Sequence, residues 1–197
     1  VEVATDTSID TVISRVNYTL SANVENLTLN YAFNTNGTGN DSNNWLVGNS
    51  GTNTLIGLGG NDVINGMTGA DTMIGAGGSD TYKVDDVYDY IEESAGGGSA
   101  DSVVSSVSFA SANIERVTLT GTAQINATLS GGLNNHLQGN DASNVLTSGN
   151  GNDSIFGECK ARLAWTNDVV FAVQCGQYGL RNSNVPFGQD GARIRRR

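Results

Sequence analysis

The 197-residue chain is poor in the residues that build most catalytic and metal centres. It has one histidine, one proline and two cysteines, and neither cysteine lies in the first 157 residues. That body therefore holds no disulfide, and the spacing of Cys159 and Cys175 fits no zinc or redox motif. His136 is a single histidine, which excludes a two-histidine metalloprotease motif; we expect it to be exposed or packed in a side-chain ladder. No serine has a base in a recognisable catalytic pattern, so we predict no catalytic site.

Basic residues are also scarce. The chain has 10 Lys and Arg against 20 Asp and Glu, a net charge of −10. Residues 1–157 carry only 3 basic residues and 17 acidic ones, so the phosphates of a nucleic acid would be repelled. No apolar run approaches the length of a membrane span. Helix is disfavoured because Gly, Asn and β-branched residues dominate.

A nine-residue repeat is the strongest pattern present. Three units run back to back over Gly57–Asn65, Gly66–Ile74 and Gly75–Lys83. Each has Gly at positions 1 and 4, Asp at position 6 and a large apolar residue at position 8. The glycines predict sharp turns, with φ values that a Cβ would forbid, and the residues around position 8 predict short extended strands. The apolar residues at position 8, which we expect to share one side, are Ile64, Met73 and Tyr82.

A turn of about six residues and a strand of three would close one rung of a stack every two repeats. Residues 18 apart then lie above one another, which aligns Asn44 with Asp62 and Asp80, and Asn53 with Asp71 and Asp89. Stacked strands are about 4.8 Å apart, so bare carboxylates repel by roughly 1 kcal/mol in water and by more where the dielectric is lower. A hard cation with six to eight oxygen ligands would remove this conflict, and calcium suits it better than magnesium. We therefore predict sites between the Asp62 and Asp80 loops and between the Asp71 and Asp89 loops.

These repeats resemble the calcium-binding nonapeptide of RTX (hemolysin-type) proteins. The resemblance implies an all-β fold, a parallel β-roll or β-solenoid of short strands joined by Gly-, Asp- and Asn-rich turns. It also implies Ca²⁺ as the bound ion and secretion from a Gram-negative bacterium or cyanobacterium by a one-step (type I) exporter. The residues expected to shape or ligate the metal sites are Gly57, Gly59, Gly60, Asp62, Gly66, Gly69, Asp71, Gly75, Gly77, Gly78, Asp80, Asp89 and Asp153.

Degenerate units flank the three best ones. Gly39–Val47 and Gly48–Ile56 keep the frame but carry Asn44 and Asn53 at position 6. Neutral Asn offers one oxygen and no charge, so we interpret these units as structural, with Asn ladders in place of ion bridges. Val84–Glu92 keeps the frame with Asp89, and Ser148–Phe156 is the last recognisable unit.

The chain also repeats at about 91 residues. Asp10-Thr-Val-Ile-Ser matches Asp101-Ser-Val-Val-Ser, and Gly60-Asn-Asp-Val-Ile matches Gly151-Asn-Asp-Ser-Ile. Each long unit has a half of alternating apolar and polar residues, which predicts β-strands. These halves are expected to continue the stack as wider rungs; a separate small β-domain is the alternative. The predicted divisions are 1–38 and 93–129 for the spacer halves, 39–92 and 130–157 for the nonapeptide blocks, and 158–197 for a basic non-repeat tail, a fusion or an artefact.

Three functions compete at this stage. The first is a calcium-binding structural module of a secreted protein, unfolded at cytosolic calcium and folded outside the cell. The second is the repeat region of a secreted protease, lipase or alginate epimerase; Val1 lies inside a repeat unit, which suggests a piece of a longer protein. The third is an adhesin or surface-layer array, favoured by the tandem 91-residue repeat. A polysaccharide or cell-surface partner would need a row of exposed aromatics, for which Tyr18, Tyr31, Trp45 and Phe109 are the scattered candidates.

Overall fold

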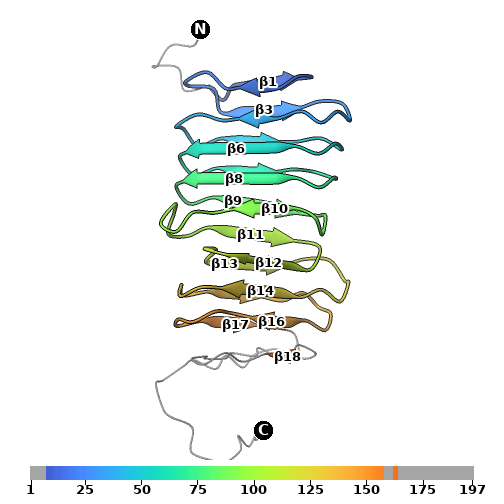
Figure 1. Ribbon diagram of the computed structural model, residues 1–197, viewed down its shortest axis with the longest axis vertical. Coiled ribbons are helices and arrows are strands. Elements are labelled where there is room, and N and C mark those ends of the chain that lie inside the picture. The colour runs from blue at the N-terminus through green and yellow to red at the C-terminus, as the bar shows by residue number, and fades with distance from the viewer. Residues whose placement is uncertain (1–7, 158–161, 164–197) are drawn as a thin grey trace, which may run out of the picture.

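The computed structural model describes residues 8–157 and the backbone of residues 162–163. Within that part of the chain the structure has strands and no helix, and the strands pair in parallel as a β-solenoid of about eight turns (Figure 1). The described residues therefore contain no helix that could cross a membrane. The predicted all-β parallel stack is confirmed.

The strands form two faces of the solenoid. One face is a single nine-stranded sheet, of β1 (Thr11–Ser14), β3 (Asn26–Leu29), β5 (Trp45–Val47), β7 (Val63–Asn65), β9 (Thr81–Val84), β11 (Ser102–Ser105), β13 (Arg116–Leu119), β15 (His136–Gln138) and β17 (Ser154–Phe156). The opposite face is divided. Its first sheet holds β2 (Tyr18–Thr19), β4 (Gly37–Thr38), β6 (Thr54–Gly59), β8 (Thr72–Gly77) and β10 (Tyr90–Glu92), and its second holds β12 (Phe109–Ala112), β14 (Ala127–Ser130), β16 (Val145–Thr147) and β18 (Arg162–Leu163).

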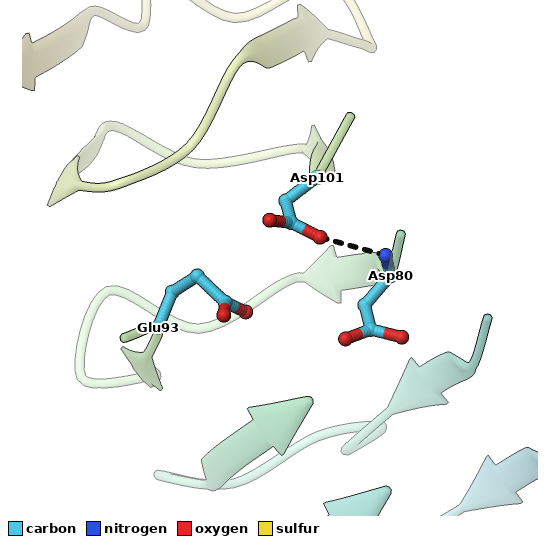
Figure 2. Close-up of side chains that lie close together, drawn as sticks. All are labelled: Asp80, Glu93 and Asp101. Carbon is cyan, nitrogen blue, oxygen red and sulfur yellow. Dashed lines mark hydrogen bonds between the residues drawn. The ribbon is translucent and has the colours of Figure 1, made fainter. Parts of the chain in front are cut away.

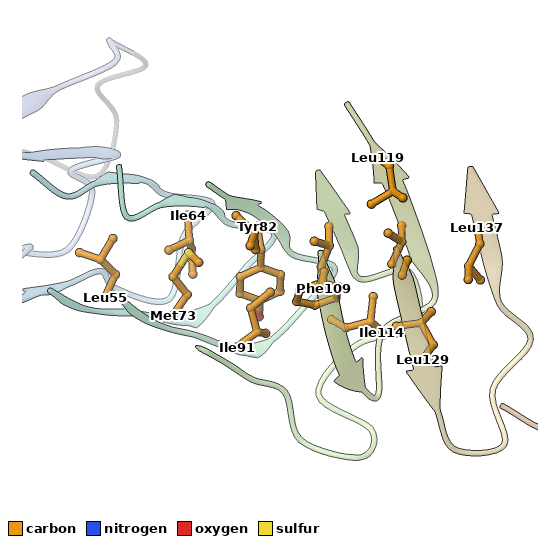
Figure 3. Packing of buried hydrophobic residues seen from close by; sticks show 14 of the residues in the cluster. Leu55, Ile64, Met73, Tyr82, Ile91, Phe109, Ile114, Leu119, Leu129 and Leu137 are labelled. Carbon is orange, nitrogen blue, oxygen red and sulfur yellow. The ribbon is translucent and has the colours of Figure 1, made fainter. Parts of the chain in front are cut away.

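The register in the nonapeptide block advances by 18 residues per turn, as predicted. Leu46 pairs with Ile64 and Ile64 with Tyr82 on one face, while Leu55 pairs with Met73 and Met73 with Ile91 on the other. Because side chains alternate along a strand, the residue at position 8 always points inward. Ile64, Met73 and Tyr82 are fully buried, and the buried apolar residues of successive turns build a continuous core along the axis (Figure 3).

The two spacer halves continue the same stack, so the separate β-domain is not formed. Their turns are not uniformly wider, however. Thr11 pairs with Asn26 and Ser102 with Arg116, which makes the first turn of each half shorter than a nonapeptide turn, whereas the next turns lengthen to Asn26–Trp45 and Arg116–His136. The expectation of wider rungs is therefore wrong for the first turn of each half, because the connections from β1 to β2 (residues 15–17) and from β11 to β12 (residues 106–108) are only three residues long.

The 91-residue repeat is visible in side-chain contacts. The Asp10 amide donates to Glu25 Oε2 at 2.9 Å, and the Asp101 amide donates to Glu115 Oε2 at 2.7 Å. At the ends of β1 and β11, the hydroxyls of Ser14 and Ser105 each hydrogen-bond the backbone carbonyl and amide of the residue two positions later. Equivalent positions of the two long units therefore make equivalent bonds.

The turns correct one detail of the glycine prediction. Gly60, Gly69 and Gly78, at position 4, have φ of 96°, 126° and 127°, as expected. The position-1 glycines are not in the left-handed region, and the second left-handed residue of each turn is instead at position 2. Those residues are not glycines, since Leu58, Met67 and Ala76 have φ of 84°, 66° and 72°.

The tail and both cysteines lie outside the described side chains. The backbone of β18 pairs with β16, so residues 162–163 add one strand to the second sheet. The division into residues 1–38, 39–92, 93–129, 130–157 and 158–197 stays a prediction.

The left-handed residue at position 2 provides a stability test. A non-glycine residue there costs about 1–3 kcal/mol of backbone strain, while Gly costs about 0.5–1 kcal/mol in unfolded-state entropy. Ala76→Gly should therefore stabilise the protein by about 1 kcal/mol, measured from denaturant midpoints. The matched control is Ala70→Gly, because Ala70 is not among the left-handed residues and the change should destabilise. Equal effects of the two substitutions would contradict the strain argument.

Candidate metal centre

Two columns of position-6 side chains run along the two edges of the solenoid. In one, the Asn44 amide donates to Asp62 Oδ1 and the Asp62 amide to Asp80 Oδ1, both at 2.7 Å. In the other, the Asn53 amide donates to Asp71 Oδ1 at 2.8 Å and the Asp71 amide to Asp89 Oδ1 at 3.0 Å. The 18-residue stacking predicted from the sequence is therefore formed on both edges.

Each stacked aspartate uses only one oxygen in this way. The second oxygen, Oδ2, of Asp62, Asp71 and Asp80 is buried and has no hydrogen-bond partner, and the same holds for Asp153, whose Oδ1 accepts the Asn135 amide at 2.9 Å. A buried polar atom without a partner costs about 1–3 kcal/mol, and more when it is charged. The same unmatched carboxylate oxygen recurs at one loop position in four loops, which fits atoms that would bind a cation.

The position-1 glycines make room for these oxygens. A Cβ on Gly57, Gly66 or Gly75 would run into Oδ2 of the aspartate five residues later in the same loop. A Cβ on Gly57 would also lie 2.9 Å from the Gly75 carbonyl oxygen of the next turn. The loop interior is thus lined by a carboxylate oxygen and a neighbouring carbonyl, which are the ligands that a hard cation such as calcium takes.

The other predicted glycines divide into two kinds. At the left-handed Gly60, Gly69 and Gly78, an added Cβ would clash with the backbone of the preceding turn, 18 residues earlier in the sequence. Gly59 and Gly77 end β6 and β8, and a Cβ there would find its nearest atoms at 3.6 Å, which is ordinary contact. A Cβ would therefore fit at those two positions, and glycine is not required there for space.

The loops of Asn44 and Asn53 satisfy their position-6 side chains without a cation, whereas Asn144 Oδ1 at the corresponding position is buried and has no partner. Asn53 Nδ2 donates to the Thr35 carbonyl at 2.6 Å, and its Oδ1 accepts the Asn49 amide at 2.8 Å. Asn44 is arranged in the same way, since its Oδ1 accepts the Asn40 amide at 2.7 Å and its Nδ2 donates to backbone carbonyls. The neutral amide therefore matches both sides of the position, which supports the structural interpretation of these loops.

Asp89 differs from the other stacked aspartates, and its role in a metal site stays a prediction. It is half-buried, and its Oδ2 accepts the backbone amides of Asp85 and Asp86, both at 3.1 Å. Its loop has Val84 rather than Gly at position 1, so the opening found in the other aspartate loops is absent. Between the Asp71 and Asp89 loops, the unmatched oxygen belongs to Asp71.

The structure adds two acidic residues that the sequence analysis did not place in a site. Asp101 Oδ1 accepts the Asp80 amide at 2.8 Å, so Asp101 extends the column beyond Asp80 after 21 residues instead of 18. Glu93 is buried, and one carboxylate oxygen each of Asp80, Glu93 and Asp101 lie within 4.8 Å of one another (Figure 2). The match of Asp101 to Asp10 in the 91-residue repeat could have indicated that Asp101 holds a structural position in the stack. Glu93 had none, because the pair Glu92-Glu93 looks like an exposed acidic edge.

Burial dominates the electrostatics of these carboxylates. Desolvation raises the pKa of Asp62 and of Asp71 from 3.8 to about 7, with repulsion from Asp80 and Asp89 respectively adding to it. Desolvation also raises the pKa of Asp101 to about 6, with added repulsion from Glu115 and Asp80. Without a cation, the folded stack therefore opposes full ionisation near neutral pH.

The expectations for His136 and for the exposed aromatic residues concern parts of the protein outside this metal centre. His136 packs in a ladder, with its ring 4.8 Å from that of Phe156, and burial and Arg116 lower its pKa. Phe109 is buried and so is not an exposed aromatic, whereas Tyr18, Tyr31 and Trp45 are exposed.

Comparison with known proteins identifies the repeat. Residues 38–73, 47–82 and 129–158 match the family model described as the RTX calcium-binding nonapeptide repeat (4 copies). Neither the curated proteins nor the solved structures contain a match. The matched segments include the loops of Asp62, Asp71, Asp80 and Asp153.

The raised pKa values predict an inverted acid response in metal-free protein. The folded carboxylates bind protons up to about pH 7, while unfolded Asp releases them near 3.8. Stability is therefore highest below the unfolded pKa and is lost as the pH rises through the folded pKa, so acidifying metal-free protein from about pH 8 to about pH 5 should raise its melting temperature. Saturating calcium should reverse the trend, because protons then compete with the ion. A melting temperature that falls on acidification of the metal-free protein would contradict this account.

Proposed function

The repeats of this chain are RTX calcium-binding nonapeptide repeats, and on that premise we propose that residues 8–157 form a structural module whose folding is coupled to calcium. The observation that supports this is the set of buried Oδ2 atoms without partners on Asp62, Asp71, Asp80 and Asp153. These four atoms occupy the same position of the repeat, and the preceding position-1 glycine leaves space beside each of the first three.

The proposed coupling follows from which buried polar atoms of the chain have hydrogen-bond partners without an ion and which do not. The side chains of Asn44 and Asn53 and the apolar core are satisfied without an ion, whereas the Asp loops bring buried negative charge together. Bound calcium supplies positive charge and accepts lone pairs from carboxylate and carbonyl oxygens together. Because such a site exists only in the folded chain, the binding free energy adds to the folding free energy.

We further propose that this coupling separates two compartments. At low cytosolic calcium, carboxylate repulsion keeps the module from closing, and at extracellular calcium it folds. Its acidity, with 17 acidic residues against 3 basic ones in residues 1–157, supports this role, because the repulsion extends beyond any single pair. We assign no catalytic role to the module.

A calcium titration of chelator-treated protein, followed by far-UV circular dichroism, tests the proposal. We expect a cooperative gain of β signal at roughly 10⁻⁴ to 10⁻³ M calcium, and no comparable gain with magnesium. β structure that is already complete in chelator would contradict coupled folding, because the Asn and apolar ladders would then suffice.

A substitution at one aspartate tests which atoms bind. Asp62→Asn should weaken calcium-induced folding by roughly tenfold, equivalent to about 1.4 kcal/mol, yet stabilise metal-free protein because it removes a buried charge. The double variant with Asp80→Asn should cost less than the sum of the single ones. Asp41→Asn is the matched control, since Asp41 is exposed in the neighbouring Asn loop. Equal effects of Asp62→Asn and Asp41→Asn would remove Asp62 from the site.

A second candidate, a repeat array of an adhesin or surface layer, is favoured by one observation. The 91-residue units stack end to end in one sheet and make equivalent Asp–Glu bonds at Asp10–Glu25 and Asp101–Glu115. Such units can be added along the same axis without changing the fold.

A further inference from the structure

The loop between β10 and β11 departs from the nonapeptide at the end of the Asp62–Asp80 column. Glu92 pairs with Ile74, so Glu93 occupies the turn position that Gly75 occupies one rung earlier. A buried glutamate side chain thus stands where the repeat leaves an opening. The loop is also longer, which moves the next column residue to Asp101.

Glu93 and Asp80 both bury an oxygen without a partner. Glu93 is 8 % exposed; its Oε2 accepts a hydrogen bond from the Tyr82 hydroxyl, and its Oε1 has no partner. Asp80 is fully buried and its Oδ2 has no partner. Figure 2 shows the carboxylate of Glu93 directed toward Asp80 and Asp101 across the gap between the two loops.

Glycines surround this gap with further oxygens. A Cβ on Gly97 would run into Glu93 Oε1 and the Ala76 carbonyl oxygen, and it would lie 3.2 Å from the Ser94 carbonyl oxygen. A Cβ on Gly98 would lie 2.7 Å from both carboxylate oxygens of Asp101. The space beside three carboxylates is therefore kept open and lined with oxygen.

We propose that Asp80, Glu93 and Asp101 form a distinct divalent-cation site that closes the ion column, and that calcium binds there more tightly than in the nonapeptide loops. The inference rests on the proposed function for the identity of the ion. Its own basis is the third carboxylate, because calcium affinity rises with the number of charged ligands. Each nonapeptide loop contributes one stacked aspartate, so a site between two such loops has two carboxylates. The site at the end of the column has three, because Glu93 joins Asp80 and Asp101.

Calorimetric titration of calcium into the metal-free full chain tests the site. In wild-type protein we expect a tight binding step that precedes the weaker steps. Glu93→Gln should weaken that first step at least tenfold and leave the later steps in place, since Gln still offers an acceptor to the Tyr82 hydroxyl. Glu92→Gln is the matched control, because it removes the same charge from the exposed neighbour.

Terbium luminescence gives an independent readout. Tyr82 contacts Glu93, so a terbium ion in this site should be sensitised by its ring. Tyr82→Phe should abolish that component of the emission at low terbium while the tight calcium step remains. This variant keeps the test open if Glu93→Gln does not fold.

The outcomes separate the two proposals. If Glu93→Gln and Glu92→Gln both bind like wild type, or if Tyr82→Phe keeps the full early emission, the tight ion does not bind at these three carboxylates and the site is overturned. Weaker calcium steps that still depend on Asp62 would then leave the proposed function intact. Absence of any calcium binding to wild-type protein would overturn both.

Discussion

The structure depends on one recurring imbalance, a buried aspartate that has a donor for only one of its two oxygens. Oδ1 accepts a backbone amide from the preceding rung, so the carboxylate is part of the stacking itself. Oδ2 faces an interior that offers carbonyl oxygens and no donor. Removing the carboxylate would lose the stacking bond, and keeping it leaves a charge that only a cation or a proton can match.

The first two asparagine loops avoid that imbalance with different bonds, because Oδ1 accepts an amide of its own loop and Nδ2 donates to a carbonyl of the preceding rung. Asn44 and Asn53 hold the same stacked position, but an amide has a donor on one side and an acceptor on the other. The rung of Asn44 and Asn53 is therefore satisfied in itself, and the next rung carries Asp62 and Asp71, whose Oδ2 atoms have no partner. Stability in such a stack is a sum over neighbouring rungs, so self-sufficient rungs provide a surface on which ion-dependent ones can assemble.

The two ends of the nonapeptide block differ in charge. Toward the N-terminus the column passes into asparagine, whereas toward the C-terminus it gains Glu93 and Asp101. The opposite column ends at Asp89, where the amides of Asp85 and Asp86 take the place of a cation. Unmatched negative charge is thereby concentrated where the solenoid passes from the nonapeptide block into its second spacer half.

The sequence alone determined the parallel stack, its 18-residue register and the aspartate columns, because Gly, Asp and apolar residues recur at a fixed period. Side-chain alternation then placed Ile64, Met73 and Tyr82 in the core without further information. Only the tertiary structure decided that position 1 needs glycine for space and not for φ, since the clashing oxygen lies five residues away. It also decided that Asp89 is matched by amides and that Glu93 joins Asp80 and Asp101. The contacts of Asp89 and Glu93 arise where the period is broken, and a broken period carries no register from which contacts can be predicted.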